Sequence, residues 1–232
     1  MKRIVLFVVL VLGSVGLASA NIPELFISTG GTTTVVVGVP GSVMFSNANF
    51  GGWDITVVAG KSSSPLSQPT GLDLASLTAA CAVGATCADL HVWLSDVGFT
   101  QPTTSFINTL SATDSGATAS VTQRAWVGLT NTLFSSDGSD GPPTVSGGSP
   151  IPAAGPITGA GGFTSVTGGP SAGPGAYSLT IEDIFKGCST GTGCNSYSAD
   201  GSLAGVPEPD SLAFLGSLLS LGAAALWRRK SA

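Results

Sequence analysis

The chain has 232 residues, of which 43% are hydrophobic and only 9% are charged, and its formal net charge is −5. Residues 21–205 contain three basic and eleven acidic side chains, which gives this part a net charge of −8. Such a body repels nucleic acid and anionic lipid, because both carry dense negative charge. Its length suits a single domain.

The first 20 residues have the features of a secretory signal peptide. Lys2-Arg3 provides a basic start, residues 4–17 form an uncharged apolar core, and Ala18-Ser19-Ala20 matches a small-residue cleavage site. We expect export through the Sec translocon and cleavage by signal peptidase after Ala20. The apolar core of 14 residues is too short for a membrane helix, which needs about 17–25 residues.

The body that follows, residues 21–205, reads as a series of short strands separated by turns. Alternating or β-branched side chains predict strands at residues 24–28, 32–39, 42–46, 53–59 and 89–99, whereas residues 72–80 fit either a strand or a short helix. Residues 105–112 and 117–129 resemble a hairpin around Asp114-Ser115-Gly116, and residues 176–185 form the last clear strand. Short strands at intervals of about ten residues favour an all-β fold, an antiparallel β-sandwich.

One segment of the body has a different composition. Between residues 141 and 175, 18 of 35 residues are Gly or Pro. Such a proportion is typical of low-complexity sequence. We therefore expect a flexible surface loop, inserted before the last strand.

The four cysteines form two pairs with equal spacing, Cys81 with Cys87 and Cys188 with Cys194. An exported chain favours disulfides, and short spacing favours the local bridges Cys81–Cys87 and Cys188–Cys194 over cross-pairing. Metal binding is disfavoured, because the spacing is not that of a zinc site and the only histidine, His91, lies on an expected strand. We predict no metal and no cofactor.

The sequence contains no strong candidate for a set of catalytic residues. A Ser-His-Asp triad would have to use His91, and no G-x-S-x-G motif is present. Glu182 and Asp183 point to opposite faces of one strand, so they do not form a carboxylate pair. The acidic stretch at 137–141 resembles a calcium loop but lacks the distal Glu, so a polar turn is the better interpretation.

Two tryptophans suggest a binding surface instead. Trp93 and Trp126 lie in expected strands whose side chains alternate between two faces. Trp126 shares its strand face with Arg124. If these faces are exposed, the indoles could stack on sugar rings. The alternative is burial in the sandwich core, where large aromatic residues usually lie.

The carboxyl terminus, residues 206–232, has three parts. Val206-Pro207-Glu208-Pro209 is short and extended, since neither proline fits a helix interior. Residues 211–227 are 17 uncharged residues, which as a helix would span about 26 Å and so could cross a membrane. Arg228, Arg229 and Lys230 follow at once and favour a cytoplasmic end.

This order of motif, helix and basic end resembles the PEP-CTERM sorting signal. The resemblance implies recognition by an exosortase, a membrane-embedded processing enzyme, and cleavage near Pro207, Glu208 and Pro209. Proteins with this signal are typical of Gram-negative bacteria that produce exopolysaccharide or biofilm. Tyr177-Ser178-Leu179-Thr180 is loosely similar to a strand found before the tail in many such proteins.

Together these features predict a non-catalytic exported protein. The precursor would be held in the inner membrane as a single-pass protein, then processed and released to the periplasm, the cell surface or the extracellular matrix. Its role would be structural or adhesive within an exopolysaccharide or biofilm layer. A carbohydrate-binding module is the alternative, and a secreted hydrolase is a remote one.

Overall fold

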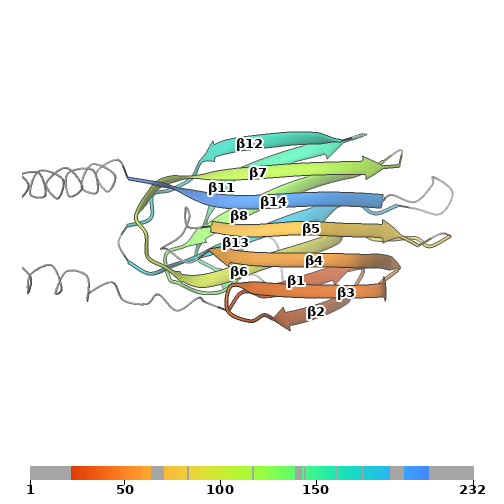
Figure 1. The fold of residues 1–232 in the computed structure, drawn as a ribbon, viewed down its shortest axis with the longest axis horizontal. Coiled ribbons are helices and arrows are strands. Elements are labelled where there is room, and N and C mark those ends of the chain that lie inside the picture. Colours follow the sequence, from red (N-terminus) through yellow and green to blue (C-terminus); the bar gives the residue numbers. More distant parts are fainter. Residues whose placement is uncertain are drawn as a thin grey trace, which may run out of the picture.

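The computed structural model describes residues 22–63, 71–82, 84–116, 118–138, 143, 145–159, 161–173, 175–188 and 196–208. Within these residues the chain forms fourteen β-strands and no helix. Twelve strands make two six-stranded antiparallel sheets (Figure 1). Sheet I has the order β11 (Gly148–Thr158), β8 (Ser120–Gly128), β13 (Tyr177–Phe185), β6 (Leu90–Phe99), β1 (Glu24–Thr29) and β2 (Thr32–Val37). Sheet II has the order β12 (Gly162–Gly168), β7 (Thr103–Ser115), β14 (Ser196–Pro207), β5 (Gly71–Cys81), β4 (Trp53–Ser63) and β3 (Ser42–Phe50). The short strands β9 (Ser135–Ser136) and β10 (Val145–Ser146) form a parallel pair.

The two sheets pack face to face as a sandwich with one main hydrophobic core. Because successive side chains of a strand point to opposite faces, every second residue enters this core. Ile27, Leu94 and Ile181 enter it from sheet I, and Leu74 and Leu203 enter it from sheet II. Each of these five side chains is at most 1% exposed. The predicted all-β class with antiparallel sheets is therefore confirmed.

The predicted strands before residue 100 are present, and the uncertain segment 72–80 is the strand β5. The predicted hairpin of 105–112 and 117–129 is wrong. β7 lies between β12 and β14 in sheet II, whereas β8 lies between β11 and β13 in sheet I. The link between them crosses from one sheet to the other. Alternation of apolar residues indicates which face of a strand is buried, but it does not identify the neighbouring strands.

The expectation of a flexible loop at 141–175 is also wrong over most of its length. β11 pairs with β8 at the edge of sheet I, and β12 pairs with β7 at the edge of sheet II. Edge strands tolerate proline, and β11 has two register shifts against β8, on either side of Ala154. Ile151, Ala154 and Ile157 are buried in the core. Burial of these three apolar side chains favours an ordered strand, although the segment is rich in Gly and Pro.

The strand β14 was missed by the sequence prediction, which placed the last strand at 176–185. It lies between β7 and β5, in the interior of sheet II. Tyr197, Ala199 and Leu203 are buried along it, but the exposed positions are small and polar, so no apolar run marks the strand. The sandwich therefore extends to Pro207 and not only to residue 205.

The expected sorting motif begins inside this strand. Val206 pairs with Ser105 and Pro207 pairs with Thr103. Pro209, the signal peptide at 1–20, the expected helix at 211–227 and the basic end at 228–230 lie outside the described residues. Within the described ranges, no helix is long and apolar enough to cross a membrane.

Candidate functional site

The outer face of sheet I brings together most of the residues singled out from the sequence. Strand pairing places Arg124, Glu182, Trp93 and Phe26 in one row across four adjacent strands. The next row contains Trp126, Thr180 and Ser95. Sequence reasoning placed Trp126 and Arg124 on one strand face correctly, since they are two residues apart on β8.

Trp93 and Trp126 stack on each other within this face. Their ring centroids are 5.3 Å apart and their planes differ by 17°. They form a second hydrophobic cluster with Phe26 and Phe134, and Trp93 is 1% exposed while Trp126 is 3% exposed. The proposed platform of two open indoles required exposed rings, and this conformation does not provide them. Their packing is that of a small core on the outside of the sheet.

A loop at residues 129–138 covers the two indoles. The Phe134 N–H donates to Ser95 Oγ at 2.8 Å, and the Gly98 N–H donates to Asn131 Oδ1 at 2.6 Å. The Phe134 ring meets Phe26 edge-on at 6.5 Å. Asn131 and Phe134 both adopt positive φ, which is uncommon for residues with a side chain. The loop is thus held against the sheet by specific contacts.

Next to the indoles, Glu182 is 1% exposed and has two basic neighbours. His91 Nδ1 lies 2.7 Å from one carboxylate oxygen, and Arg124 Nη1 lies 3.9 Å from the other. Buried carboxylates need such partners, because desolvation is costly. His91 is therefore a hydrogen-bond partner of the buried Glu182 carboxylate. Asp89, which directly precedes β6, binds Lys186 and the Gly187 N–H instead.

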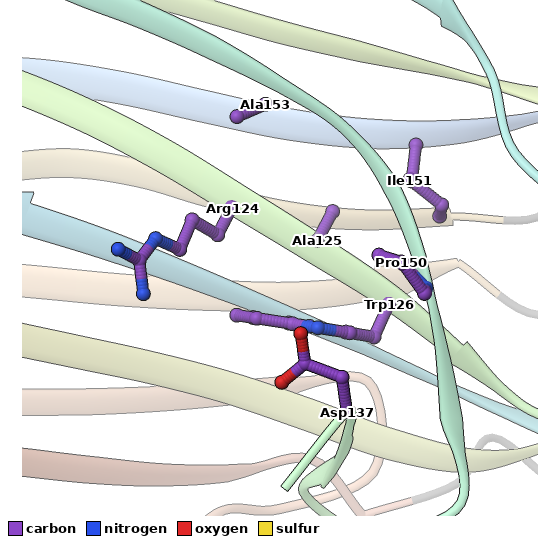
Figure 2. A pocket seen from close by; sticks show the side chains of 7 residues that line it. All are labelled: Arg124, Ala125, Trp126, Asp137, Pro150, Ile151 and Ala153. Atoms are coloured by element: carbon purple, nitrogen blue, oxygen red, sulfur yellow. The ribbon is translucent and has the colours of Figure 1, made fainter. Parts of the chain in front are cut away.

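A cavity of about 350 Å³ opens beside Trp126 (Figure 2). It is lined by Arg124, Ala125, Trp126, Asp137, Pro150, Ile151 and Ala153. Its volume lies within the range of small-ligand sites, about 300–1,000 Å³. The cavity thus combines an indole, aliphatic side chains, a guanidinium donor and a carboxylate acceptor.

Three segments build this cavity: β8, the covering loop and the edge strand β11. Pro150 is paired directly with Trp126, which fixes the apolar wall. Asp137, which sequence reasoning assigned to a polar turn, is an exposed lining residue, while 139–142 lie outside the described residues. Asp137 and Pro150 were missed as site residues, because neither carries a local signal that it faces Trp126.

The cavity carries little net positive charge. Arg124 is the one basic residue among those that line it, and the acidic side chains of Asp137 and the neighbouring Glu182 offset it. An acidic ligand would meet the carboxylate of Asp137, and the domain as a whole is acidic. The chemistry therefore fits a neutral ligand with hydroxyl groups.

The disulfide Cys81–Cys87 is confirmed, with its Cα atoms 6.1 Å apart. The second expected bridge, Cys188–Cys194, cannot be placed, since Cys194 lies outside the described residues. Cys188 is buried close to the first bridge.

The chain matches no protein-family model and no curated protein. Among solved structures, it is similar to the N-terminal cellulose-binding domain of β-1,4-glucanase C from Cellulomonas fimi, with 17% identity and a TM-score of 0.34, over 74% of this chain and 92% of that one. It is also similar to the adhesin domain of Epf from Streptococcus pyogenes, with 13% identity and a TM-score of 0.39, over 81% of this chain and 60% of that one. A third similarity is to the C-terminal CBM6 of LamC from Zobellia galactanivorans, with 11% identity and a TM-score of 0.25, over 70% of this chain and 98% of that one. At these low scores the similarities carry no argument about function.

Proposed function

We propose that this chain is an exported, non-catalytic surface protein whose sandwich binds a neutral carbohydrate. The observation that carries the proposal is the cavity beside Trp126, where Arg124 and Asp137 place a donor and an acceptor against an apolar wall. Sugar rings present apolar C–H faces and hydroxyl groups that both donate and accept. Sites of this kind need few polar groups to fix the orientation of a ligand.

The neighbouring residues favour binding over hydrolysis. Glycoside hydrolysis uses two carboxyl groups on either side of the scissile bond. Glu182, the nearest buried carboxylate, does not line the cavity and is engaged by His91 and Arg124. Its carboxylate lies 3.9 Å from Arg124 Nη1 and attracts the guanidinium. A cavity with one carboxylate, Asp137, and a positioned arginine suits recognition.

Both chain ends support the exported location. The signal peptide at 1–20 would direct translocation, and the motif at 206–209 with the apolar stretch at 211–227 would hold the precursor in the inner membrane until an exosortase acts. The described strands end at Pro207, so cleavage beyond this residue would release an intact sandwich. The protein would then serve as a structural or adhesive component of an exopolysaccharide layer.

Affinity electrophoresis of the processed protein through gels containing neutral or acidic polysaccharides tests this function. We expect retardation by a neutral polysaccharide, and a loss of about tenfold or more in affinity for Arg124→Gln and for Asp137→Asn, since each removes a charge-assisted hydrogen bond. Lys61→Gln is the control, because Lys61 has the same charge but lies on β4 of sheet II. Equal retardation of all variants, or none for the wild type, would contradict the site.

A further inference from the structure

Three cysteine sulfur atoms gather at one end of the sandwich. The Sγ atoms of Cys81, Cys87 and Cys188 all lie within 4.8 Å of one another, and all three residues are buried. Cys81 and Cys87 form the disulfide. Among the described residues, Cys188 carries no disulfide. An existing bridge and a third sulfur are thus in close proximity.

The backbone aligns Cys188 with one sulfur of the bridge in particular. Cys87 and Cys188 face each other in an antiparallel β-bridge, and the Cys87 N–H donates to the Cys188 carbonyl at 2.9 Å. Directly opposed residues have Cβ atoms about 4.5–5.5 Å apart, so a disulfide, which requires about 3.5–4.5 Å, needs the two segments to move slightly closer. The approach of the two segments is tight at Gly187, where a Cβ would lie 2.0 Å from the Cys87 carbonyl oxygen.

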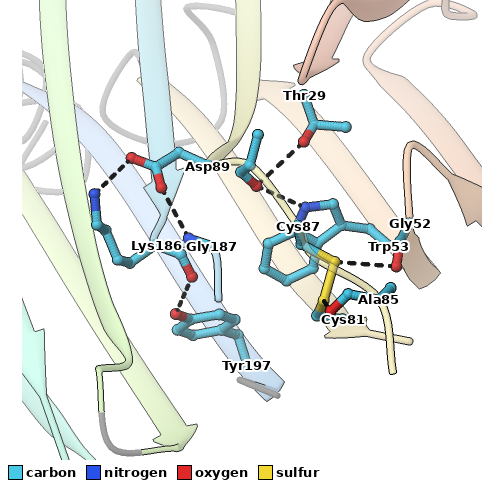
Figure 3. Close-up of a disulfide and its surroundings, with 11 residues drawn as sticks. Thr29, Gly52, Trp53, Cys81, Ala85, Cys87, Asp89, Lys186, Gly187 and Tyr197 are labelled. Atoms are coloured by element: carbon cyan, nitrogen blue, oxygen red, sulfur yellow. Dashed lines mark hydrogen bonds and ion pairs between the residues drawn. A yellow bond between two sulfur atoms is a disulfide. The ribbon is translucent and has the colours of Figure 1, made fainter. Parts of the chain in front are cut away.

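Further hydrogen bonds fix both segments (Figure 3). Asp89 Oδ1 accepts from the Gly187 N–H at 2.9 Å, and its other oxygen lies 3.0 Å from Lys186 Nζ. The Ala88 carbonyl accepts from Trp53 Nε1 at 3.0 Å. These contacts hold the residues on either side of the cysteines.

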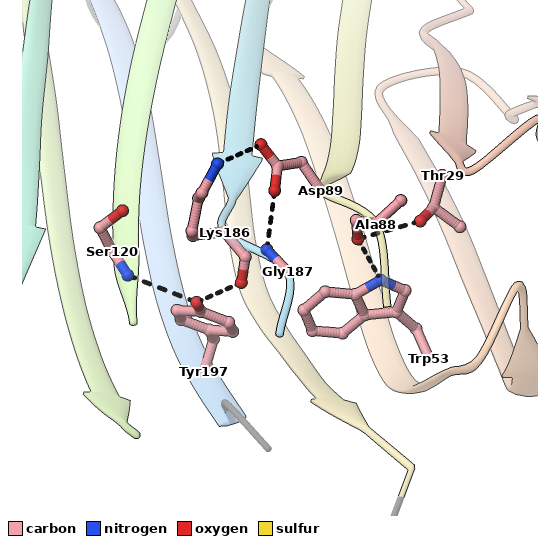
Figure 4. A network of polar contacts seen from close by, with 8 residues as sticks. All are labelled: Thr29, Trp53, Ala88, Asp89, Ser120, Lys186, Gly187 and Tyr197. Atoms are coloured by element: carbon pink, nitrogen blue, oxygen red, sulfur yellow. Dashed lines mark hydrogen bonds and ion pairs between the residues drawn. The ribbon is translucent and has the colours of Figure 1, made fainter. Parts of the chain in front are cut away.

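The Lys186 end is secured from sheet II as well (Figure 4). The Tyr197 hydroxyl donates to the Lys186 carbonyl at 2.6 Å and accepts from the Ser120 N–H at 3.3 Å. Tyr197 is 2% exposed and packs against Phe185. The β-bridge between Cys87 and Cys188 is therefore built into the fold from both sheets.

We propose that these three cysteines form a thiol–disulfide exchange site, in which Cys188 takes Cys87 from its bridge to Cys81. The Cys188 thiol loses its proton to solvent, and its thiolate attacks Cys87 Sγ. The Cys81–Cys87 bond breaks, the Cys87–Cys188 bond forms, and Cys81 leaves as a thiolate that takes up a proton. One disulfide is consumed and one is formed, so the step needs no external oxidant or reductant.

The exchange changes what the bridge connects. Cys81–Cys87 closes a short loop between β5 and β6, with a sequence separation of 6. Cys87–Cys188 would instead span 100 intervening residues and tie this loop to the end of β13. A longer closed loop restricts the unfolded chain more. The site thereby converts a local bridge into a long-range cross-link.

Peptide mapping without reduction tests the proposal on the full processed chain. The Cys194→Ser variant is incubated without oxygen in glutathione buffer at pH 8, alkylated, digested with elastase and examined by mass spectrometry. We expect a peptide that joins Cys87 to Cys188, with the alkyl label on Cys81. The matched control, Cys188→Ser with Cys194→Ser, retains only Cys81–Cys87. Complete retention of Cys81–Cys87 in Cys194→Ser, with the label on Cys188, would overturn the proposal.

The mapping result depends on the equilibrium between the Cys81–Cys87 and Cys87–Cys188 bridges. A second variant, in which only one of these bridges can form, removes this dependence. In the double variant Cys81→Ser, Cys194→Ser, only Cys87 and Cys188 remain, and the far-UV circular dichroism spectrum reports whether the sheets are retained. With oxidised glutathione, we expect a monomer that has lost both titratable thiols and whose intact mass is lower by two hydrogen atoms, with no glutathione adduct. If the folded variant keeps both thiols open to a thiol reagent, the geometry does not support the cross-link. The wild-type chain, mapped in the same way, checks that the variants have not created the pairing.

Discussion

Asp183 on β13 and Gln123 on β8 are directly paired, and both are fully buried between the two sheets. Gly201 of sheet II faces them, and a Cβ there would lie 1.9 Å from Gln123 Nε2. Two polar side chains thus lie inside the hydrophobic core, and the absence of a side chain at Gly201 leaves space for them. Burial raises the pKa of Asp183 to about 8, so the carboxyl is protonated at neutral pH.

The first prediction concerns the pH dependence of stability. In the unfolded chain Asp183 ionises near the ordinary aspartate pKa of 3.8, whereas in the folded chain it keeps its proton until about pH 8. The stability contribution of this group is therefore fully present below pH 3.8 and is lost as the pH rises to about 8. Between about pH 5 and pH 8 the free energy of unfolding should fall by on the order of 3 kcal/mol.

Urea unfolding of the wild type and Asp183→Asn at several pH values measures this fall. Asparagine keeps the shape without an ionisable proton, so the slope of stability against pH should become shallower over the same range. Some slope should remain, because burial also raises the pKa of Asp73, Asp96 and Asp114. Identical slopes for the two proteins would show that Asp183 does not titrate as described.

The second prediction tests the close approach at Gly187. A Cβ at this position would lie 2.0 Å from the Cys87 carbonyl oxygen and 2.6 Å from the Ala88 carbonyl carbon, and backbone atoms cannot easily move aside. Gly187→Ala should lower the free energy of unfolding by about 2 kcal/mol or more. Gly173→Ala is the matched control, because no heavy atom lies within 4 Å of a Cβ there. Urea denaturation measures the free energy of unfolding of both variants. Equal values for Gly187→Ala and Gly173→Ala would argue against the close approach at Gly187.

The sequence could predict those strands whose alternation is strong. Leu90, Val92 and Leu94 alternate within residues 89–99, as do Tyr177, Leu179 and Ile181 within 176–185, and β6 and β13 lie at these places. β14 could not be found in this way, because its inward positions include the small residues Ala199 and Gly201 and its exposed positions are the polar Ser198 and Asp200. Its place is determined by its neighbours β5 and β7, and this information is absent from the strand itself.

The candidate site was predictable only in part, for a related reason. Arg124 and Trp126 share a strand face through local alternation alone. Asp137 and Pro150 reach the same cavity through a loop and an edge strand, so their proximity depends on sheet order. The burial of Trp93 likewise depends on Phe134, which lies 41 positions later in the chain. No pattern within one strand carries such contacts.

The third prediction concerns the cover over the stacked indoles. Phe134 packs with Trp93 and Trp126, and its N–H donates to Ser95. Phe134→Ala keeps the backbone donor but removes the ring, so it should cost about 3 kcal/mol and admit water to the indoles. Tryptophan fluorescence should shift to longer wavelength in the folded variant. An unchanged emission maximum and an unchanged urea midpoint would show that the ring does not shield the pair.

The fourth prediction separates positioning from direct contact in the cavity. Glu182 lies 3.9 Å from Arg124 Nη1 but does not line the cavity. Glu182→Gln removes the charge that orients the guanidinium, so carbohydrate affinity should fall by several-fold, less than for Arg124→Gln. Combining the two changes should add little, because both act through the same side chain. Additive losses in affinity electrophoresis would instead mean that Glu182 acts on the ligand by a separate route.

The fifth prediction concerns the carboxyl end of the sandwich. β14 makes paired contacts as far as Val206 with Ser105 and Pro207 with Thr103. A chain terminated after Glu208 should therefore unfold at the same urea concentration as the processed protein, whereas termination after residue 195 removes an interior strand and should abolish cooperative unfolding. Termination after residue 204 should give an intermediate midpoint, since only the last pairs are lost. If the chain ending at residue 195 unfolded like the processed protein, β14 could not be part of the core, and cleavage near the motif would place no limit on the released domain.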